Sequence, residues 1–156
     1  MLYGVTLLLL IAIALGPQLP AQGSQDKPNL TGTWVIVLPE SSGGEEETIK
    51  HDGMTLTRGH GSEGGHGHSF TYKLDGSESR NVIEPHAGEQ IVLLARAAWE
   101  GTTLVIKEVA TYPNGRKREV TSRWWLDEKG QLHVETDSSV DGKPEPTMKI
   151  VYRKKR

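Results

Sequence analysis

The sequence contains no cysteine in its 156 residues. Disulfide bonds and thiol catalysis are therefore excluded, and so is the acylated cysteine with which bacterial lipoproteins attach to a membrane. A folded domain without disulfides has to be stabilised by burial and hydrogen bonding alone. The chain beyond its N-terminal segment is long enough for one domain with a sizeable hydrophobic core.

The chain also lacks an excess of charge of one sign. Its 18 basic and 20 acidic residues give a formal net charge of −2, and all of them lie beyond the first 21 residues. This balance excludes a global field that would attract nucleic acid or an acidic membrane. The basic C-terminal residues 153–156 are typical of a solvated tail.

Motifs that carry catalytic chemistry are missing as well. The sequence has no G-x-S-x-G elbow, no phosphate-binding P-loop and no H-E-x-x-H metal motif. The glycines between Gly61 and Gly67 do not have the spacing of a dinucleotide fingerprint. We therefore expect a protein that is not an enzyme.

The N-terminal segment has the layout of a secretory signal. Residues 5–15 (VTLLLLIAIAL) carry no charge, Pro17 interrupts the apolar run, and Ala21 offers a small residue for cleavage. The run is too short to cross the roughly 30 Å hydrocarbon core of a membrane. Residues 1–21 are predicted to be a signal peptide that directs export to the periplasm or the exterior. Because no Lys or Arg precedes the run, a retained anchor or a misassigned start is the alternative.

Residues 22–29 are expected to form a linker, and residues 30–156 a single all-β domain. No stretch of ten residues shows the apolar periodicity of a helix, whereas strand patterns recur every 10 to 15 residues between Gly, Pro, Asn and Asp. Expected strands cover residues 31–38, 48–51, 54–57, 68–74, 90–99, 102–112, 116–126, 131–138 and 147–154. Turns are expected at Asp52-Gly53 and Asp75-Gly76, and a polar connection at 77–89.

Eight to ten antiparallel strands joined by tight turns predict an up-and-down β-barrel, because closure removes exposed strand edges. An open two-sheet sandwich is the structural alternative. Two-residue alternation assigns one face of each strand to the interior. The inward set, which would bind a ligand, is Ile36, Phe70, Tyr72, Leu93, Ile106, Val120, Trp124, Val134 and Ile150. Trp99 and Trp125 are expected to be partly exposed.

Two segments carry a family resemblance. Residues 30–34 (LTGTW) resemble the G-x-W opening of lipocalins and fatty-acid-binding proteins. Trp99-Glu100-Gly101 is similar to the W-D-G hairpin of fatty-acid-binding proteins, and residues 151–154 (VYRK) match the V-Y-x-K pattern of their last strand. The resemblance covers the first strand and the second half of the chain. It implies a lipocalin-like (calycin) barrel in which Gly32 and Trp34 form a structural plug at the bottom.

The departures from that pattern are specific. Residues 39–47 are too few and too rich in Gly, Ser and Glu for the two helices that fatty-acid-binding proteins place there. Ile150 stands where they have an Arg that binds a carboxylate, so that subsite does not carry over. Residues 70–81 (FTYKLDGSESRN) resemble a segment of secreted bacterial proteins without an assigned function. The chain is thus similar to a distant lipocalin-like barrel.

We therefore expect an exported, non-catalytic, monomeric barrel that binds a small, mostly apolar molecule in its interior. It should need no cofactor, bind no nucleic acid and remain outside the membrane after signal cleavage. The first alternative is a metal-binding protein, because the glycine-rich residues 58–69 contain His60, His66 and His68, and imidazole is a ligand for Zn²⁺ or Cu²⁺. A structural or interaction module of the cell envelope is the second.

Overall fold

The computed structural model describes residues 26–42, 44–60, 68–85 and 88–156. Within them the chain forms eleven strands and one short 3₁₀ turn, η1 (Glu40–Ser42). The strands are β1 (Gly32–Leu38), β2 (Glu46–His51), β3 (Thr55–His60), β4 (His68–Lys73), β5 (Asp75–Ile83), β6 (Ile91–Glu100), β7 (Thr103–Thr111), β8 (Lys117–Leu126), β9 (Leu132–Val140), β10 (Lys143–Pro144) and β11 (Met148–Lys154).

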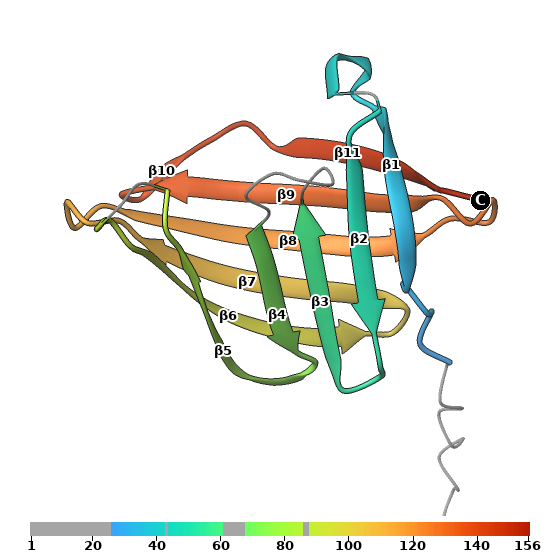
Figure 1. Cartoon of the computed structure of the whole chain (residues 1–156), viewed down its shortest axis with the longest axis horizontal. Coiled ribbons are helices and arrows are strands. Elements are labelled where there is room, and N and C mark those ends of the chain that lie inside the picture. Colours follow the sequence, from blue (N-terminus) through green and yellow to red (C-terminus); the bar gives the residue numbers. More distant parts are fainter. Residues whose placement is uncertain (1–25, 43, 61–67, 86–87) are drawn as a thin grey trace, which may run out of the picture.

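The strands pair in the order β4-β3-β2-β1-β11-β9-β8-β7-β6-β5, and β10 pairs only with β9. Every pairing is antiparallel. Strands β2 to β4 cross the long strands β6 to β9 at a steep angle, so the single sheet wraps around a shared interior (Figure 1). This confirms the predicted all-β, up-and-down barrel, which is nearly closed, and it rules out an open sandwich.

The barrel closes between β4 and β5, where the described strands share no backbone pairing. Side chains of β5 connect them instead. The Asn81 amide accepts a hydrogen bond from the Thr71 N–H (2.8 Å) and donates one to the Thr71 carbonyl (3.1 Å). The Ser79 hydroxyl accepts one from the Lys73 N–H (2.8 Å). Two inward polar side chains therefore complete the wall that backbone ladders form elsewhere.

This seam corrects two expectations for the first half of the chain. Residues 77–83 are part of β5 rather than of a polar connection, and Asp75 and Gly76 begin that strand. The sequence pattern missed β5 because its inward positions, Ser79 and Asn81, are buried although they are polar. The hairpin between β2 and β3 also turns one residue later than expected, since the Asp52 N–H bonds the Thr55 carbonyl.

Buried side chains fill one end of the barrel interior. Trp34 is 1% exposed, and its indole N–H donates to the Leu30 carbonyl at 2.9 Å. The side chain of Lys154 lies across Gly32 and places its ammonium 5.6 Å from the centroid of the Trp34 ring. A Cβ on Gly32 would come within 2.5 Å of the Lys154 Cε, and the φ of +148° disfavours other residues. The two segments that carry the family resemblance at the ends of the domain, residues 30–34 and 151–154, are therefore in contact here.

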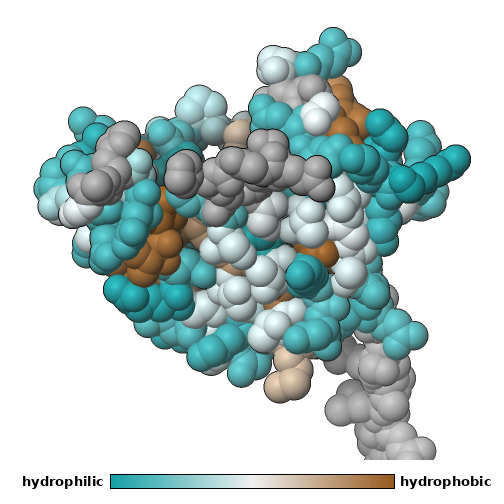
Figure 2. Space-filling view, in the orientation of Figure 1, coloured by the Kyte–Doolittle hydropathy of each residue, from teal (hydrophilic) through white to brown (hydrophobic). Residues whose placement is uncertain are grey.

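The expected signal peptide, residues 1–21, lies outside the described residues. Across the part of the chain that the structure describes, no helix is long and apolar enough to span a membrane. Large exposed hydrophobic side chains are Leu38, Met54, Val82, Leu94 and Met148. On the face shown in Figure 2 the hydrophobic surface forms separate small areas among hydrophilic residues.

Candidate ligand-binding cavity

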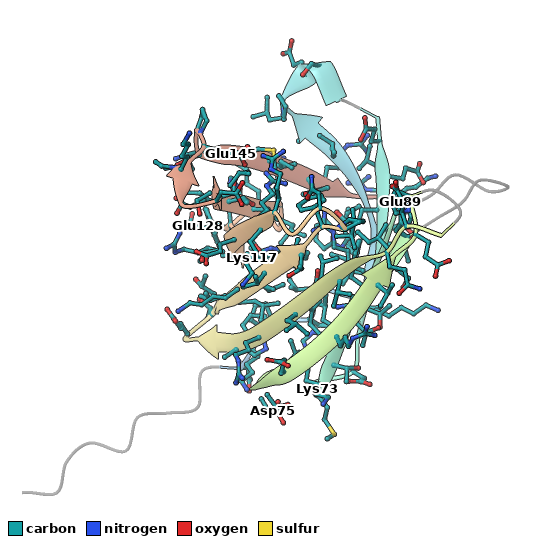
Figure 3. All side chains as sticks on the ribbon, turned by 90° about the vertical axis from the view of Figure 1, so that its left-hand side faces the viewer. Lys73, Asp75, Glu89, Lys117, Glu128 and Glu145 are labelled. Atoms are coloured by element: carbon teal, nitrogen blue, oxygen red, sulfur yellow. The ribbon has the colours of Figure 1, made fainter. Side chains whose placement is uncertain are left out.

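A cavity of about 250 Å³ lies inside the barrel, at the end opposite the Trp34 plug. It is formed where β5 ends, β6 and β8 begin, and β7 turns back. Figure 3 shows this end, with Lys117 and Glu145 on one side of it and Glu89 on the other. The lining residues are Arg58, Ile83, Ile91, Leu93, Glu108, Ala110, Tyr112, Arg118, Val120, Ser122, Val134, Thr136, Met148, Ile150 and Tyr152.

The sequence-predicted interior residues are divided between this cavity and the packed core. Leu93, Val120, Val134 and Ile150 line the cavity, where Val134 also belongs to the core cluster and Ile150 packs against it. Ile36, Tyr72, Ile106 and Trp124 are buried in the core cluster, and Phe70 is partly buried against it. Strand alternation indicates which side chains point inward, but it does not distinguish a wall of the cavity from a filled layer.

Trp99 and Trp125 are both half-buried; Trp99 packs against the core cluster from the inward face of β6, whereas Trp125 is next to the inward Trp124 and points outward. Trp125 stacks on His133 with the ring centroids 5.3 Å apart. Trp99 lies 5.8 Å from the ring of His51 near the packed end. Each indole ring therefore packs against the ring of a neighbouring histidine.

Charged groups lie inside the barrel as well. The guanidinium of Arg58 forms an ion pair with Glu47, whose side chain is only 2% exposed. The same guanidinium lies 5.3 Å from the centroid of the Trp124 ring. Burial is the largest single influence on Arg58 and disfavours its charge, but the attraction of Glu47, Tyr72 and Tyr152 and the hydrogen bond to Glu47 together outweigh it and raise the pKa of the guanidinium. Glu47 also accepts a hydrogen bond from Tyr152, and burial raises the pKa of that phenol. The positive charge of Arg58 is therefore neutralised within the protein.

A second polar contact crosses the interior between opposite walls. The hydroxyl of Tyr72 on β4 donates to the Glu108 carboxylate on β7 at 2.9 Å. Burial, reinforced by the negative charge of Glu108, raises the pKa of Tyr72, which therefore remains a protonated donor. Ser122 accepts the indole N–H of Trp124 at 3.1 Å. The lining of the cavity therefore combines polar and charged side chains with apolar ones.

The rim carries a second cation. Arg118 donates two hydrogen bonds to one carboxylate oxygen of Glu145 (3.1 and 2.9 Å) and one to the Ser138 hydroxyl (3.2 Å). Met148 also lines the rim and is 49% exposed, so the cavity reaches the surface there.

Sequence reasoning missed the interior polar residues, although alternation could have found one of them. Glu108 has the same parity on its strand as Ile106 and Ala110. Glu47 and Arg58 were placed in polar and glycine-rich loops, because the expected strands began at residue 48 and ended at residue 57. Their burial depends on pairing with each other across β2 and β3, and a single strand pattern contains no signal for that.

The expected metal site lies mostly outside the described residues. His66 falls in 61–67, and the side chain of His60 is not described. His68 is exposed at the start of β4, where its backbone is in register with His60. Among the described residues no group of three or more His, Asp or Glu side chains is arranged to hold a metal ion. Metal binding by these three histidines remains a prediction.

Two comparisons with known proteins found no match. The chain matches no protein-family model, and a search of curated proteins finds no significant match. The nearly closed antiparallel barrel is consistent with a lipocalin-like fold. The cavity and its lining residues are therefore the basis for assigning a function.

Proposed function

We propose that the protein is a non-catalytic, exported binding protein that holds one small amphipathic molecule in the cavity. The observation that carries this proposal is a cavity at one end of the barrel, lined by eight apolar and seven polar or charged residues that expose more apolar than polar surface, whereas buried side chains fill the other end. Concave, mostly apolar sites with a small number of oriented polar groups are typical of small-molecule binding.

The size of the cavity limits the ligand. Its volume of about 250 Å³ lies below the roughly 300–1,000 Å³ of most drug-sized ligand sites. A cavity of this size favours a compact small molecule over a long-chain lipid.

A methyl NMR titration with n-octanol tests the proposal. We expect chemical-shift changes at the methyl groups of Leu93, Val120, Val134 and Ile150, which line the cavity. The exposed methyl groups of Val82 and Leu94 on the outer surface serve as the internal control. Equal shifts at inner and outer methyl groups, or none at either, would disprove an interior site.

Export is supported by the uncharged apolar run at residues 5–15 and the small Ala21. Mass spectrometry of the protein recovered from a bacterial host tests this part separately. We expect an N-terminus close to residue 22 in the periplasmic or extracellular fraction. A chain that retains Met1 in the cytosol would contradict export without affecting the cavity.

A further inference from the structure

The charge distribution of the cavity specifies the polar group of its ligand. Two arginines line the cavity, and each already has a carboxylate partner: Arg58 pairs with Glu47, and Arg118 with Glu145. Of the described residues that line the cavity, Glu108 alone carries a carboxylate. Among the described residues, the Tyr72 hydroxyl is the hydrogen-bond partner of the Glu108 carboxylate, and no Lys, Arg or His side chain lies within ion-pair distance of that carboxylate.

Within the part of the chain that the structure describes, the Glu108 carboxylate therefore has a neutral hydrogen-bond donor but no positively charged partner. Tyr72 contributes one neutral hydrogen bond, and a carboxylate can accept more than one. Glu108 is half-buried and lines the cavity, and a carboxylate forms its strongest hydrogen bonds with positively charged donors. A second carboxylate in the same space would be repelled instead.

We infer that the cavity selects an organic cation, an ammonium group on a compact apolar body, with Glu108 as the partner of the ammonium. The inference rests on the proposed function and names the ligand class of that same site. The rings of Tyr112 and Tyr152 also line the cavity, and aromatic faces attract cations. The inference differs from what the family resemblance suggests, since the expected carboxylate-binding Arg is replaced by Ile150, and Glu108 supplies the opposite charge.

Calorimetric titration near pH 7 with n-octylamine, n-octanol and sodium octanoate tests this, because the three probes share a chain and differ in the head group. We expect octylamine to bind at least tenfold more tightly than octanoate, with octanol between them. Octanoate binding as tightly as octylamine would overturn the choice of a cation. Failure of all three to bind would instead overturn the proposed function.

The substitution Glu108→Gln removes the charge and keeps an oxygen that accepts from Tyr72. We expect it to weaken octylamine binding roughly tenfold and to leave octanol binding unchanged. Glu119→Gln on β8 is the matched control, because Glu119 is exposed and points away from the interior, and its octylamine affinity should equal that of wild type. Unchanged octylamine affinity in folded Glu108→Gln protein would refute the role of Glu108. The comparison of head groups on wild type does not depend on this variant.

Discussion

The ammonium of Lys154 lies 5.6 Å from the centre of the Trp34 ring, and its aliphatic chain crosses the backbone at Gly32. Trp34 and Lys154 are register partners on β1 and β11, and these first and last strands pair with each other. The contact therefore fixes the packed end of the barrel. Its position opposite the cavity lets one end provide stability while the other remains open.

Gly32→Ala should destabilise the protein by about 2 kcal/mol or more, as it adds backbone strain and displaces Lys154 from the Trp34 ring. Urea unfolding measures the effect. Gly115→Ala is the control, because Gly115 has a φ of +80° but nothing within 4 Å of an added Cβ, so strain alone should cost about 1 kcal/mol. Equal losses in the two variants would show that Lys154 does not restrict Gly32.

Asn81→Ala should loosen the seam between β4 and β5. The substitution removes both hydrogen bonds to the Thr71 backbone and should cost about 1–3 kcal/mol. Hydrogen exchange should show a faster Thr71 amide, with little change in β7 and β8. Glu78→Ala, at an exposed position of the same strand, should change stability by less than about 0.5 kcal/mol. A Thr71 amide that stays as protected as in wild type would argue against side-chain closure.

The buried ion pair should show strong coupling in a double-mutant cycle. Glu47→Gln removes the carboxylate that pairs with the buried guanidinium of Arg58 and should cost about 3 kcal/mol. In the Arg58→Met background the same substitution should cost at least about 1 kcal/mol less, because no charge is left unpaired. Thermal or urea unfolding of the four proteins provides the data. Additive effects would mean that the two side chains do not depend on each other.

His51 should make the protein less stable in mild acid. Its Nε2 is buried without a partner among the described residues, its Nδ1 faces the Leu30 N–H at 3.5 Å, and burial lowers the pKa of the ring below 6.5. The unfolded chain therefore binds more protons than the folded one as the pH falls below 6.5, so the free energy of unfolding decreases there. Well above pH 6.5, where the ring is neutral in both states, this residue adds no pH dependence.

NMR titration of the His51 ring and unfolding at about pH 7.5 and 5.5 measure this effect. His51→Gln should reduce the loss of stability between the two values, whereas His68→Gln, at an exposed position, should leave it unchanged. Carboxylates such as Asp52, whose pKa is lowered mainly by backbone hydrogen bonds, lose their contribution only below about pH 3.8. A His51 ring that titrates at or above pH 6.5 would contradict this prediction.

The second half of the fold was predictable because two signals coincide there. Apolar residues alternate along β6 to β9, and glycines with positive φ stand in the turns between them, as at Gly101 and Gly130. In β5 buried and exposed positions also alternate, but the buried positions hold the polar residues Ser79 and Asn81. Their burial is compensated by hydrogen bonds to the neighbouring strand, which a hydrophobic pattern does not reveal.

The candidate site was predictable only as a set of inward positions. Ile106 and Val120 have the same kind of pattern on adjacent strands, yet Ile106 is in the packed core and Val120 lines the cavity. The difference arises from how many side chains reach each level of the barrel from the other strands. The ion pair of Arg58 likewise depends on a partner from another strand, so the polar character of the interior emerges only in three dimensions.

The most direct test of interior binding is calorimetric titration of n-octanol into wild type, Ala110→Phe and Ala98→Phe. Ala110 faces the cavity from β7, whereas Ala98 lies on the exposed side of β6. We predict one site in wild type, affinity reduced at least tenfold by Ala110→Phe because the ring fills the cavity, and no change in Ala98→Phe. Undiminished binding by folded Ala110→Phe, or no binding by wild type, would contradict binding in the interior.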